Sequence, residues 1–159
     1  MLKYEYKINL PYEFHPERSG SKYKIGEKFK NAGEFLESVA KCHRGLDYLV
    51  NPTTDWSRGS DIESEGASVK SGKASLCRLH GGSFEEIFEG YFAGVASTKW
   101  IYMVQVDTVA IEYHMNKDEF KEFVKQFGRL GVESGKHEKK IKLLATSGKT
   151  IAWLEARVA

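Results

Sequence analysis

The chain has 159 residues, of which 41% are hydrophobic and 13% aromatic, and its formal net charge is only +2, a composition that excludes intrinsic disorder. Its two cysteines are too few for a disulfide framework and match no zinc-binding spacing. Because no segment is typical of a signal peptide or apolar over the length of a membrane span, we expect a cytoplasmic protein folded as a single domain over residues 1–159.

The N-terminal part is predicted to begin with a strand and a helix. Residues 2–10 alternate weakly between apolar and polar side chains, which favours a strand. A helix is predicted to start after Asn31, with Glu34 three residues on as in a capping box, and to end near Gly45.

Another helix and two strands are predicted in the middle of the chain. Ser83 and Glu86 have the spacing of a capping box, so a helix is expected to begin there and to run to about Ala96. Residues 100–106 and 108–114 are rich in β-branched and aromatic side chains, which favours two strands.

The last part of the chain is predicted to hold a third helix and a hairpin. Asn116 is expected to cap the helix, with Glu119 at the capping-box position. Residues 139–145 and 150–158 flank a short turn that contains glycine, which favours a β-hairpin. Taken in order, these elements predict an α/β (α+β) domain with helices around a mixed central sheet and an additional C-terminal β-hairpin.

The chemistry is expected in a short central segment. Residues 60–63 and 67–71 are joined by three residues that include a glycine, which favours a hairpin. Side chains two apart on a strand share a face, so Ser68 and Lys70 are predicted to point the same way. The turn folds the preceding run back beside them, which can bring Asp61 next to Lys70.

An acid and a lysine in this arrangement suit the hydrolysis of a phosphodiester. A carboxylate can hold Mg²⁺, which prefers oxygen ligands, and the ion lowers the pKa of a bound water. A nearby lysine can stabilise the charge that develops on the phosphoryl group. We therefore expect catalytic roles for Asp61, Lys70 and Ser68, with Mg²⁺ as cofactor and Mn²⁺ as its substitute. Asp55 and Glu63 are alternative acids.

This segment resembles the core motif of the PD-(D/E)XK nuclease superfamily, which includes many restriction endonucleases. In that pattern an Asp ends one strand, and an acid-x-Lys triplet lies on the next. Asp61 matches the Asp, and Ser68 to Lys70 matches the triplet with serine in the acid position. The resemblance implies a restriction-endonuclease-like fold and metal-dependent cleavage of DNA.

With serine in the acid position, the metal site implied by the resemblance lacks one carboxylate ligand. Some restriction-endonuclease branches are similar in having Ser-x-Lys here, and in them a Glu on the following helix supplies the missing ligand. The resemblance therefore implies Glu85 or Glu86 as a metal ligand and catalytic residue, with Glu89 on the same helical face. The superfamily often places an acid on the first helix, so Glu34 and Glu37 are alternatives.

Lysines concentrate near the C-terminus, where five of them accompany a single acid between positions 136 and 149. Such a strip can dock on phosphates, although the same lysines can also protect an exposed sheet edge from pairing. Two further basic residues follow the central motif in a glycine-containing loop. The DNA-binding residues expected on these grounds are Lys73, Arg78, Lys136, Lys139, Lys140, Lys142 and Lys149.

Together these features predict a Mg²⁺-dependent DNA endonuclease, of the sequence-specific restriction type. A chain of this size presents one active site, so cutting both strands of a duplex calls for a homodimer. A homing endonuclease or Holliday-junction resolvase of the same fold is the first alternative, and a non-catalytic DNA-binding module is the second.

Overall fold

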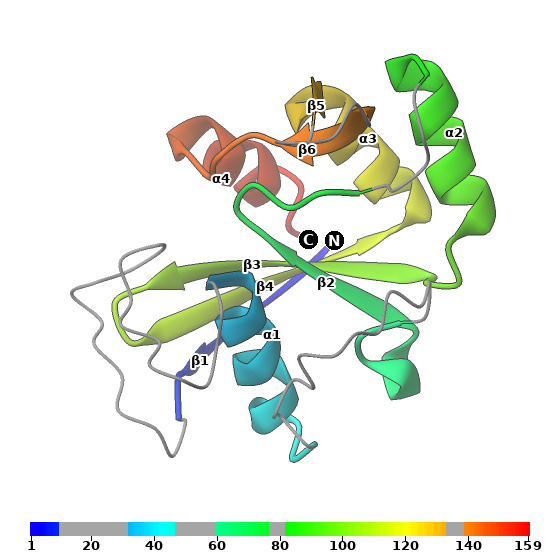
Figure 1. Cartoon of the computed structure of the whole chain (residues 1–159). Helices are drawn as coiled ribbons and strands as arrows, with labels where there is room; N and C mark the ends of the chain where they lie inside the picture. Colours follow the sequence, from blue (N-terminus) through cyan, green and yellow to red (C-terminus); the bar gives the residue numbers. More distant parts are fainter. Residues whose placement is uncertain (10–31, 47–59, 77–81, 133–138) are drawn as a thin grey trace.

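The computed structural model describes residues 1–9, 32–46, 60–76, 82–132 and 139–159. These residues form a four-stranded mixed sheet, four α-helices and a separate two-stranded sheet, an α+β arrangement (Figure 1). None of the helices in these ranges is long and apolar enough to cross a membrane. In chain order the elements are β1 (Leu2–Lys7), α1 (Ala32–His43), the 3₁₀ turn η3 (Glu63–Glu65), β2 (Ala67–Ser71), α2 (Phe84–Gly94), β3 (Lys99–Val106), β4 (Val109–Asn116), α3 (Lys117–Phe127), β5 (Gly128–Val132), β6 (Lys139–Leu143) and α4 (Gly148–Glu155).

The four-stranded sheet has the order β1-β4-β3-β2. Its first three strands are antiparallel neighbours, whereas β2 pairs with β3 in parallel and places Lys70 opposite Tyr102. Parallel neighbours need a crossover connection, and the segment that contains α2 supplies it. The central motif is therefore on a strand that is joined to its neighbour by a helix.

Each face of the sheet carries its own core, because successive side chains of β3 alternate between the two faces. Trp100 and Tyr102 join one cluster with side chains of α2, α3 and α4, and Ile101 and Met103 join the other with side chains of α1. Figure 1 shows α1 on one side of the sheet and the other helices on the opposite side. All four side chains are buried. As a result, α1 and α2 lie on opposite sides of the sheet.

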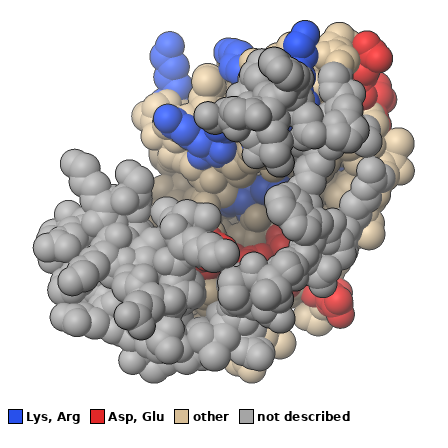
Figure 2. All heavy atoms as spheres, in the orientation of Figure 1, with Lys and Arg blue, Asp and Glu red and all other residues tan. Residues whose placement is uncertain are grey.

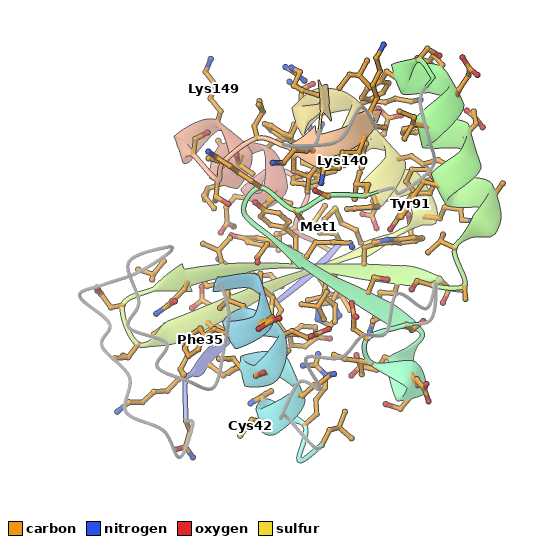
Figure 3. All side chains as sticks on the ribbon, viewed as in Figure 1. Met1, Phe35, Cys42, Tyr91, Lys140 and Lys149 are labelled. Carbon is orange, nitrogen blue, oxygen red and sulfur yellow. The ribbon has the colours of Figure 1, made fainter. Side chains whose placement is uncertain are left out.

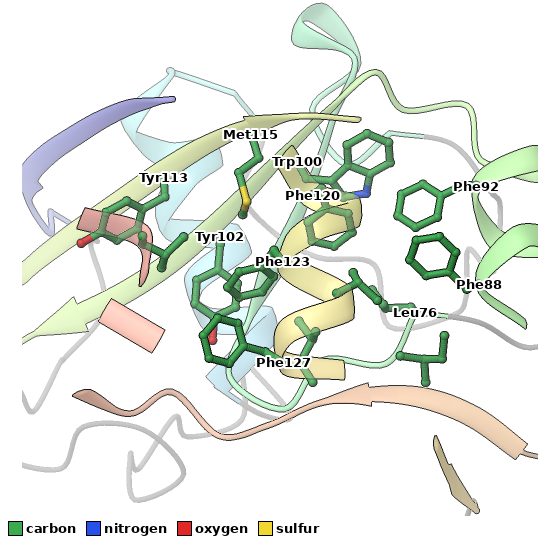
Figure 4. Close-up of a cluster of buried hydrophobic side chains, with 14 of the residues drawn as sticks. Leu76, Phe88, Phe92, Trp100, Tyr102, Tyr113, Met115, Phe120, Phe123 and Phe127 are labelled. Atoms are coloured by element: carbon green, nitrogen blue, oxygen red, sulfur yellow. The ribbon is translucent and has the colours of Figure 1, made fainter. Parts of the chain in front are cut away.

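The larger core is rich in aromatic rings (Figure 4). Trp100 and Phe120 are stacked, with their ring centroids 5.1 Å apart and their planes 7° apart. Phe123 lies one turn further along α3. Its ring centroid is 4.9 Å from that of Tyr102 and 5.6 Å from that of Trp153 on α4. Such ring pairs stabilise a fold by more than the free energy of burying their surface alone, and here they fix α3 and α4 to the sheet.

Most of the predicted elements are confirmed. The first strand and the first helix are present as β1 and α1, and the two central strands as β3 and β4. Helices α2 and α3 both begin with the predicted capping boxes, formed by Ser83 with Glu86 and by Asn116 with Glu119. Local capping chemistry was enough to locate these two helices.

The predicted hairpin over residues 60–71 is wrong, because the two runs share a single isolated β-bridge and form no ladder. Ile62 and Ala67 exchange backbone hydrogen bonds of 3.0 and 3.1 Å around η3. The turn closes at Gly66, which has φ 60, and the Gly66 carbonyl accepts hydrogen bonds from the N–H groups of Thr98 and Lys99. These bonds attach the turn to the start of β3, and β2 pairs with β3 instead.

The predicted C-terminal hairpin is also wrong, because residues 148–155 form helix α4. Ser147 caps it in a capping box with Thr150, and burial of Leu154 holds the helix on the aromatic core. Strand β6 pairs instead with β5, and both follow α3 in the chain. An apolar run with β-branched and aromatic residues has no clear period over eight residues, so capping and packing decide its conformation.

Several expectations lie outside the described residues. They concern the Asn31 cap, the alternative acid Asp55, and the basic residues Arg78 and Lys136.

Gly128, where α3 passes into β5, has no room for a side chain. A Cβ there would lie 2.5 Å from the Val124 carbonyl oxygen and 2.9 Å from Ile141 Cγ2. We expect Gly128→Ala to lower the free energy of unfolding by about 1–3 kcal/mol through overpacking. The matched control is Gly148→Ala, where a Cβ meets nothing within 4 Å, and it should cost no stability in urea unfolding. Equal effects of the two changes would contradict this account.

Candidate functional site

Asp61 lies at the corner that precedes β2, and a backbone hydrogen bond orients its carboxylate. The N–H of Val69 donates to Asp61 Oδ2 at 2.7 Å. The next residue, Ile62, is fully buried and makes the bridge to Ala67. This anchored corner holds Asp61 beside β2 although the predicted hairpin is absent.

Glu37 approaches Asp61 from α1. The side chain of Glu37 is half-buried, and the neighbouring residues Leu36 and Ser38 are buried. Burial, the hydrogen bond with Asp61 and the negative charge of Asp61 together raise the pKa of Glu37 to about 8. Two carboxyl groups this close hold a proton at neutral pH, and a cation bound between them would displace it.

Two lysines act on Glu37 through their charges, although the register sets Lys70 opposite Tyr102, on the face of the sheet away from α1. The positive charges of Lys41, one helical turn after Glu37, and of Lys70 on β2 act to lower the pKa of Glu37. Within the described ranges, no three His, Cys, Asp or Glu side chains gather in a way that could hold a metal ion. Two carboxylates nevertheless suit Mg²⁺, which is commonly bound by one or two carboxylates together with waters and substrate phosphates.

The Ser68 side chain interacts with other hydroxyl groups and not with the carboxylate pair. Its hydroxyl lies 2.6 Å from the Ser97 hydroxyl, and its side chain is buried. Ser60 Oγ lies 3.1 Å from the same Ser97 oxygen. The three hydroxyls tie the beginning of β2 to the segment before β3, which is a structural role that differs from the catalytic one expected for Ser68.

The structure does not bring Glu85 and Glu86 to Asp61, which corrects the expected metal ligands. Both are exposed residues of the first turn of α2, and α2 packs on the opposite face of the sheet from α1. The carboxylate of Glu86 accepts a hydrogen bond from the Ser83 N–H at 3.3 Å in the capping box. Glu37, an alternative in the sequence analysis, is the glutamate that reaches Asp61.

Basic side chains gather on one part of the surface. In Figure 2, Lys and Arg atoms lie over the layer of β5, β6 and α4, while acidic atoms show at the upper right over α2 and lower on the same face. Lys139 and Lys142 of β6 are exposed, as is Lys73 after β2. Lys149 projects from the start of α4, and Lys140 is half-buried (Figure 3).

A buried ion pair lies at the C-terminal end of α1. Arg44 binds both carboxylate oxygens of Glu112 on β4, at 2.8 Å from Nη1 and 2.6 Å from Nη2. Tyr6 donates its hydroxyl to the same carboxylate, and His114 Nε2 lies 2.8 Å from it. Burial alone would raise the pKa of Glu112, but these partners outweigh it and lower the pKa to about 2.

The same guanidinium also binds the segment that carries Asp61. Arg44 Nε donates to Glu65 of η3, which in turn accepts from Lys99 Nζ at 2.7 Å. Arg44 therefore joins the end of α1, strand β4 and the turn four residues after Asp61. We call this set of Arg44, Glu112 and Glu65 the arginine clamp, and it fixes the two elements that supply Glu37 and Asp61.

Sequence reasoning missed several of these groups. Lys41 lies four residues after Glu37, and this helical spacing is a signal that could have been used. Arg44 and Glu112 are 68 residues apart, so no local pattern connects them.

Comparison of the chain with protein-family models, with curated proteins and with solved structures finds no match. The geometry of the carboxylate pair, of the arginine clamp and of the basic surface is therefore what bears on function.

Removal of the clamp's arginine should strongly destabilise the fold. Arg44→Ala leaves the Glu112 carboxylate buried without its positive partner, and we expect a loss of about 3–5 kcal/mol in the free energy of unfolding. Lys125→Ala is the control, because it removes an exposed pair with Glu122 at 3.7 Å and should cost less than about 1 kcal/mol. Urea unfolding curves measure both, and a small effect of Arg44→Ala would refute the role given to the clamp.

The raised pKa of Glu37 should make stability fall as pH rises. Between its ordinary value of 4.5 and about 8, the folded chain binds more protons at this group than the unfolded chain does, so the free energy of unfolding decreases through that window. Glu37→Gln removes this dependence. At about pH 9 we expect it to be more stable than wild type by roughly 1–3 kcal/mol, with the gain vanishing toward pH 4.

Urea unfolding at a series of pH values tests this expectation. Glu122→Gln, which removes an exposed carboxylate of α3, is the control for the loss of one negative charge. A gain for Glu37→Gln that does not change with pH would show that Glu37 is not protonated in the folded chain.

Proposed function

We propose that this chain is a Mg²⁺-dependent endodeoxyribonuclease in which Glu37 and Asp61 hold the ion. The observation that carries the proposal is the close carboxylate pair, in which burial, the hydrogen bond between the two groups and their mutual repulsion raise the pKa of Glu37 to about 8. A divalent cation relieves this repulsion, so the pair has a physical reason to bind one. When bound, Mg²⁺ would neutralise phosphoryl oxygens and make a water more acidic, and Mn²⁺ would substitute for it.

Two lysines complete the proposed site. Lys70 and Lys41 act electrostatically on Glu37, and their proposed role is to attract a phosphate to the pair. The role proposed for Lys70 is to stabilise negative charge on the phosphoryl group and to orient the attacking water. Asp61, held by the Val69 N–H, keeps a fixed position while this happens.

The proposed fold is restriction-endonuclease-like. An acid, a Ser-x-Lys strand and a following helix occur in this chain in the order that the resemblance implies, although Asp61 lies at a corner and does not end a strand. The departure is the source of the second carboxylate, which comes from α1 here. A glutamate on this helix was the second route that the resemblance allowed.

The proposed substrate is duplex DNA. Lys73, Lys139, Lys140, Lys142 and Lys149 are the basic residues proposed to contact its phosphates, since phosphate contacts position a protein on DNA. One chain supplies one carboxylate pair, so a cytoplasmic homodimer of the sequence-specific restriction type is proposed for cutting both strands. A homing endonuclease or junction resolvase would use the same site.

Lys70→Ala should abolish cleavage and leave DNA binding largely intact. Loss of one group that stabilises transition-state charge typically lowers the rate by about 10²–10³-fold. The measurement is cleavage of plasmid and of branched DNA with Mg²⁺ and with EDTA, beside binding in EDTA. Lys125→Ala is the control, because it also removes one positive charge, at an exposed position of α3.

Each outcome of this experiment decides between functions. Discrete plasmid fragments support a restriction-type enzyme, and cutting of branched DNA alone supports a junction resolvase. Binding without Mg²⁺-dependent cleavage by the wild-type chain would instead identify a non-catalytic DNA-binding module.

A further inference from the structure

The two edge strands of the four-stranded sheet differ in what covers them. On the outer side of β2, the Val69 N–H donates to Asp61 Oδ2. Ile62 bridges to Ala67 on the same side, so this edge is occupied by the chain itself. On the outer side of β1, no strand of the described ranges pairs (Figure 1). Such an edge offers unpaired N–H and C=O groups to another strand.

The register of β1 shows which of its backbone groups face outwards. The Ile8 N–H donates to the Thr108 carbonyl at 2.7 Å, in the register in which β1 pairs with β4. Hydrogen-bonded and non-hydrogen-bonded pairs alternate along an antiparallel ladder, so the even-numbered residues of β1 bond to β4 and the odd-numbered ones face the open edge. The outward carbonyl of Met1 accepts from the Ala159 N–H at 3.0 Å. The open edge therefore begins after Met1.

The side chains of β1 alternate between the two faces of the sheet. Leu2 and Tyr4 are 55% and 48% exposed, and they share the face on which Tyr6 packs against the core of α1. Lys3 and Glu5 lie on the other face, and Glu5 is 54% exposed. Apolar side chains therefore follow one another on one face of this edge, and opposite charges follow one another on the other face.

A second copy of β1 that runs antiparallel to the first matches this pattern in one register. Directly opposite residues of two strands share a face, so a two-fold axis through Tyr4 sets Leu2 opposite the partner's Tyr6. The same axis sets Lys3 opposite the partner's Glu5. An axis one residue further along sets two glutamates opposite each other, and an axis one residue earlier sets two lysines opposite each other. Like charges in that position are destabilising.

The existing contacts of Lys3 are compatible with this pairing. Its ammonium group binds Glu155 of α4 at 2.5 Å and Glu5 of its own strand at 3.1 Å. A lysine has three N–H donors, so it can bind the partner's Glu5 while it keeps both contacts. The pairing therefore adds interactions and displaces none of these.

We propose that β1 pairs with β1 of a second copy of this chain, so that the two sheets join into one across a two-fold axis at Tyr4. The interface covers Leu2 and Tyr4, and it brings the two Tyr4 rings together as a cross-strand aromatic pair. It supplies the homodimer of the proposed function, and only its role in cutting both DNA strands rests on that function. A short edge buries little surface, so we expect a dimer that forms at micromolar concentrations.

The test is sedimentation velocity over a series of protein concentrations, without DNA or metal. Wild type should shift from monomer to dimer as its concentration rises. Glu5→Lys sets a lysine opposite Lys3 of the partner subunit and should raise the dissociation constant of the dimer about tenfold or more. Glu5→Pro should have the same effect, because it removes an N–H that faces the open edge. Glu122→Lys makes the same change of charge at an exposed position of α3 and should dimerise as wild type does.

A charge exchange between two chains gives a readout that local damage to β1 would not produce. Lys3→Glu should also weaken self-association, because it sets a glutamate opposite the partner's Glu5. An equimolar mixture of Lys3→Glu with Glu5→Lys sets opposite charges against each other at both positions. The mixture should therefore form a dimer although neither variant does so alone at the same concentration.

Failure of this inference is distinguishable from failure of the proposed function. A wild-type chain that stays monomeric overturns the interface, as does a dimer that Glu5→Lys and Glu5→Pro leave unchanged. Mg²⁺-dependent cleavage by such a chain would still support the nuclease. A dimer that these variants disrupt, in a chain that cleaves no DNA, supports the interface and overturns the nuclease.

Discussion

Glu112 is 1% exposed on the central strand β4, and a charge in that position requires a positive partner. Arg44 supplies it with two hydrogen bonds and thereby fixes the end of α1 to the sheet. Its remaining nitrogen binds Glu65, so the turn that follows Asp61 is held by the same group. The arrangement of α1, the sheet and the motif corner depends on this clamp, and the proposed metal site depends on that arrangement.

The carboxylate pair is an electrostatically unfavourable arrangement, and the clamp helps to keep its two members close together. Glu37 and Asp61 repel each other when both are charged, so without other contacts they would separate. The buried side chains of α1, packed on Ile101 and Met103, prevent this separation. At neutral pH a proton on Glu37 relieves this repulsion, and a cation could take the place of that proton; such perturbed carboxyl groups are typical of functional sites.

The elements that the sequence predicted correctly are those with strong local chemistry. The capping boxes at Ser83 and Asn116 locate α2 and α3, and the two long β-branched and aromatic runs became β3 and β4. The two hairpins failed for the opposite reason. Tertiary packing decides which strand a short apolar run pairs with. Here β2 pairs with β3 and β6 pairs with β5, and neither pairs with the neighbouring run predicted from the sequence.

The sequence by itself determined the acid and the lysine of the motif, the helices with capping boxes and the basic C-terminal strip. Only the tertiary structure decided that Glu37 rather than Glu85 or Glu86 meets Asp61. The reason is that a helix may cover either face of a sheet, and the side it takes depends on packing between distant residues. Trp100 with Phe120, and Arg44 with Glu112, are contacts of that kind, and local sequence does not encode them.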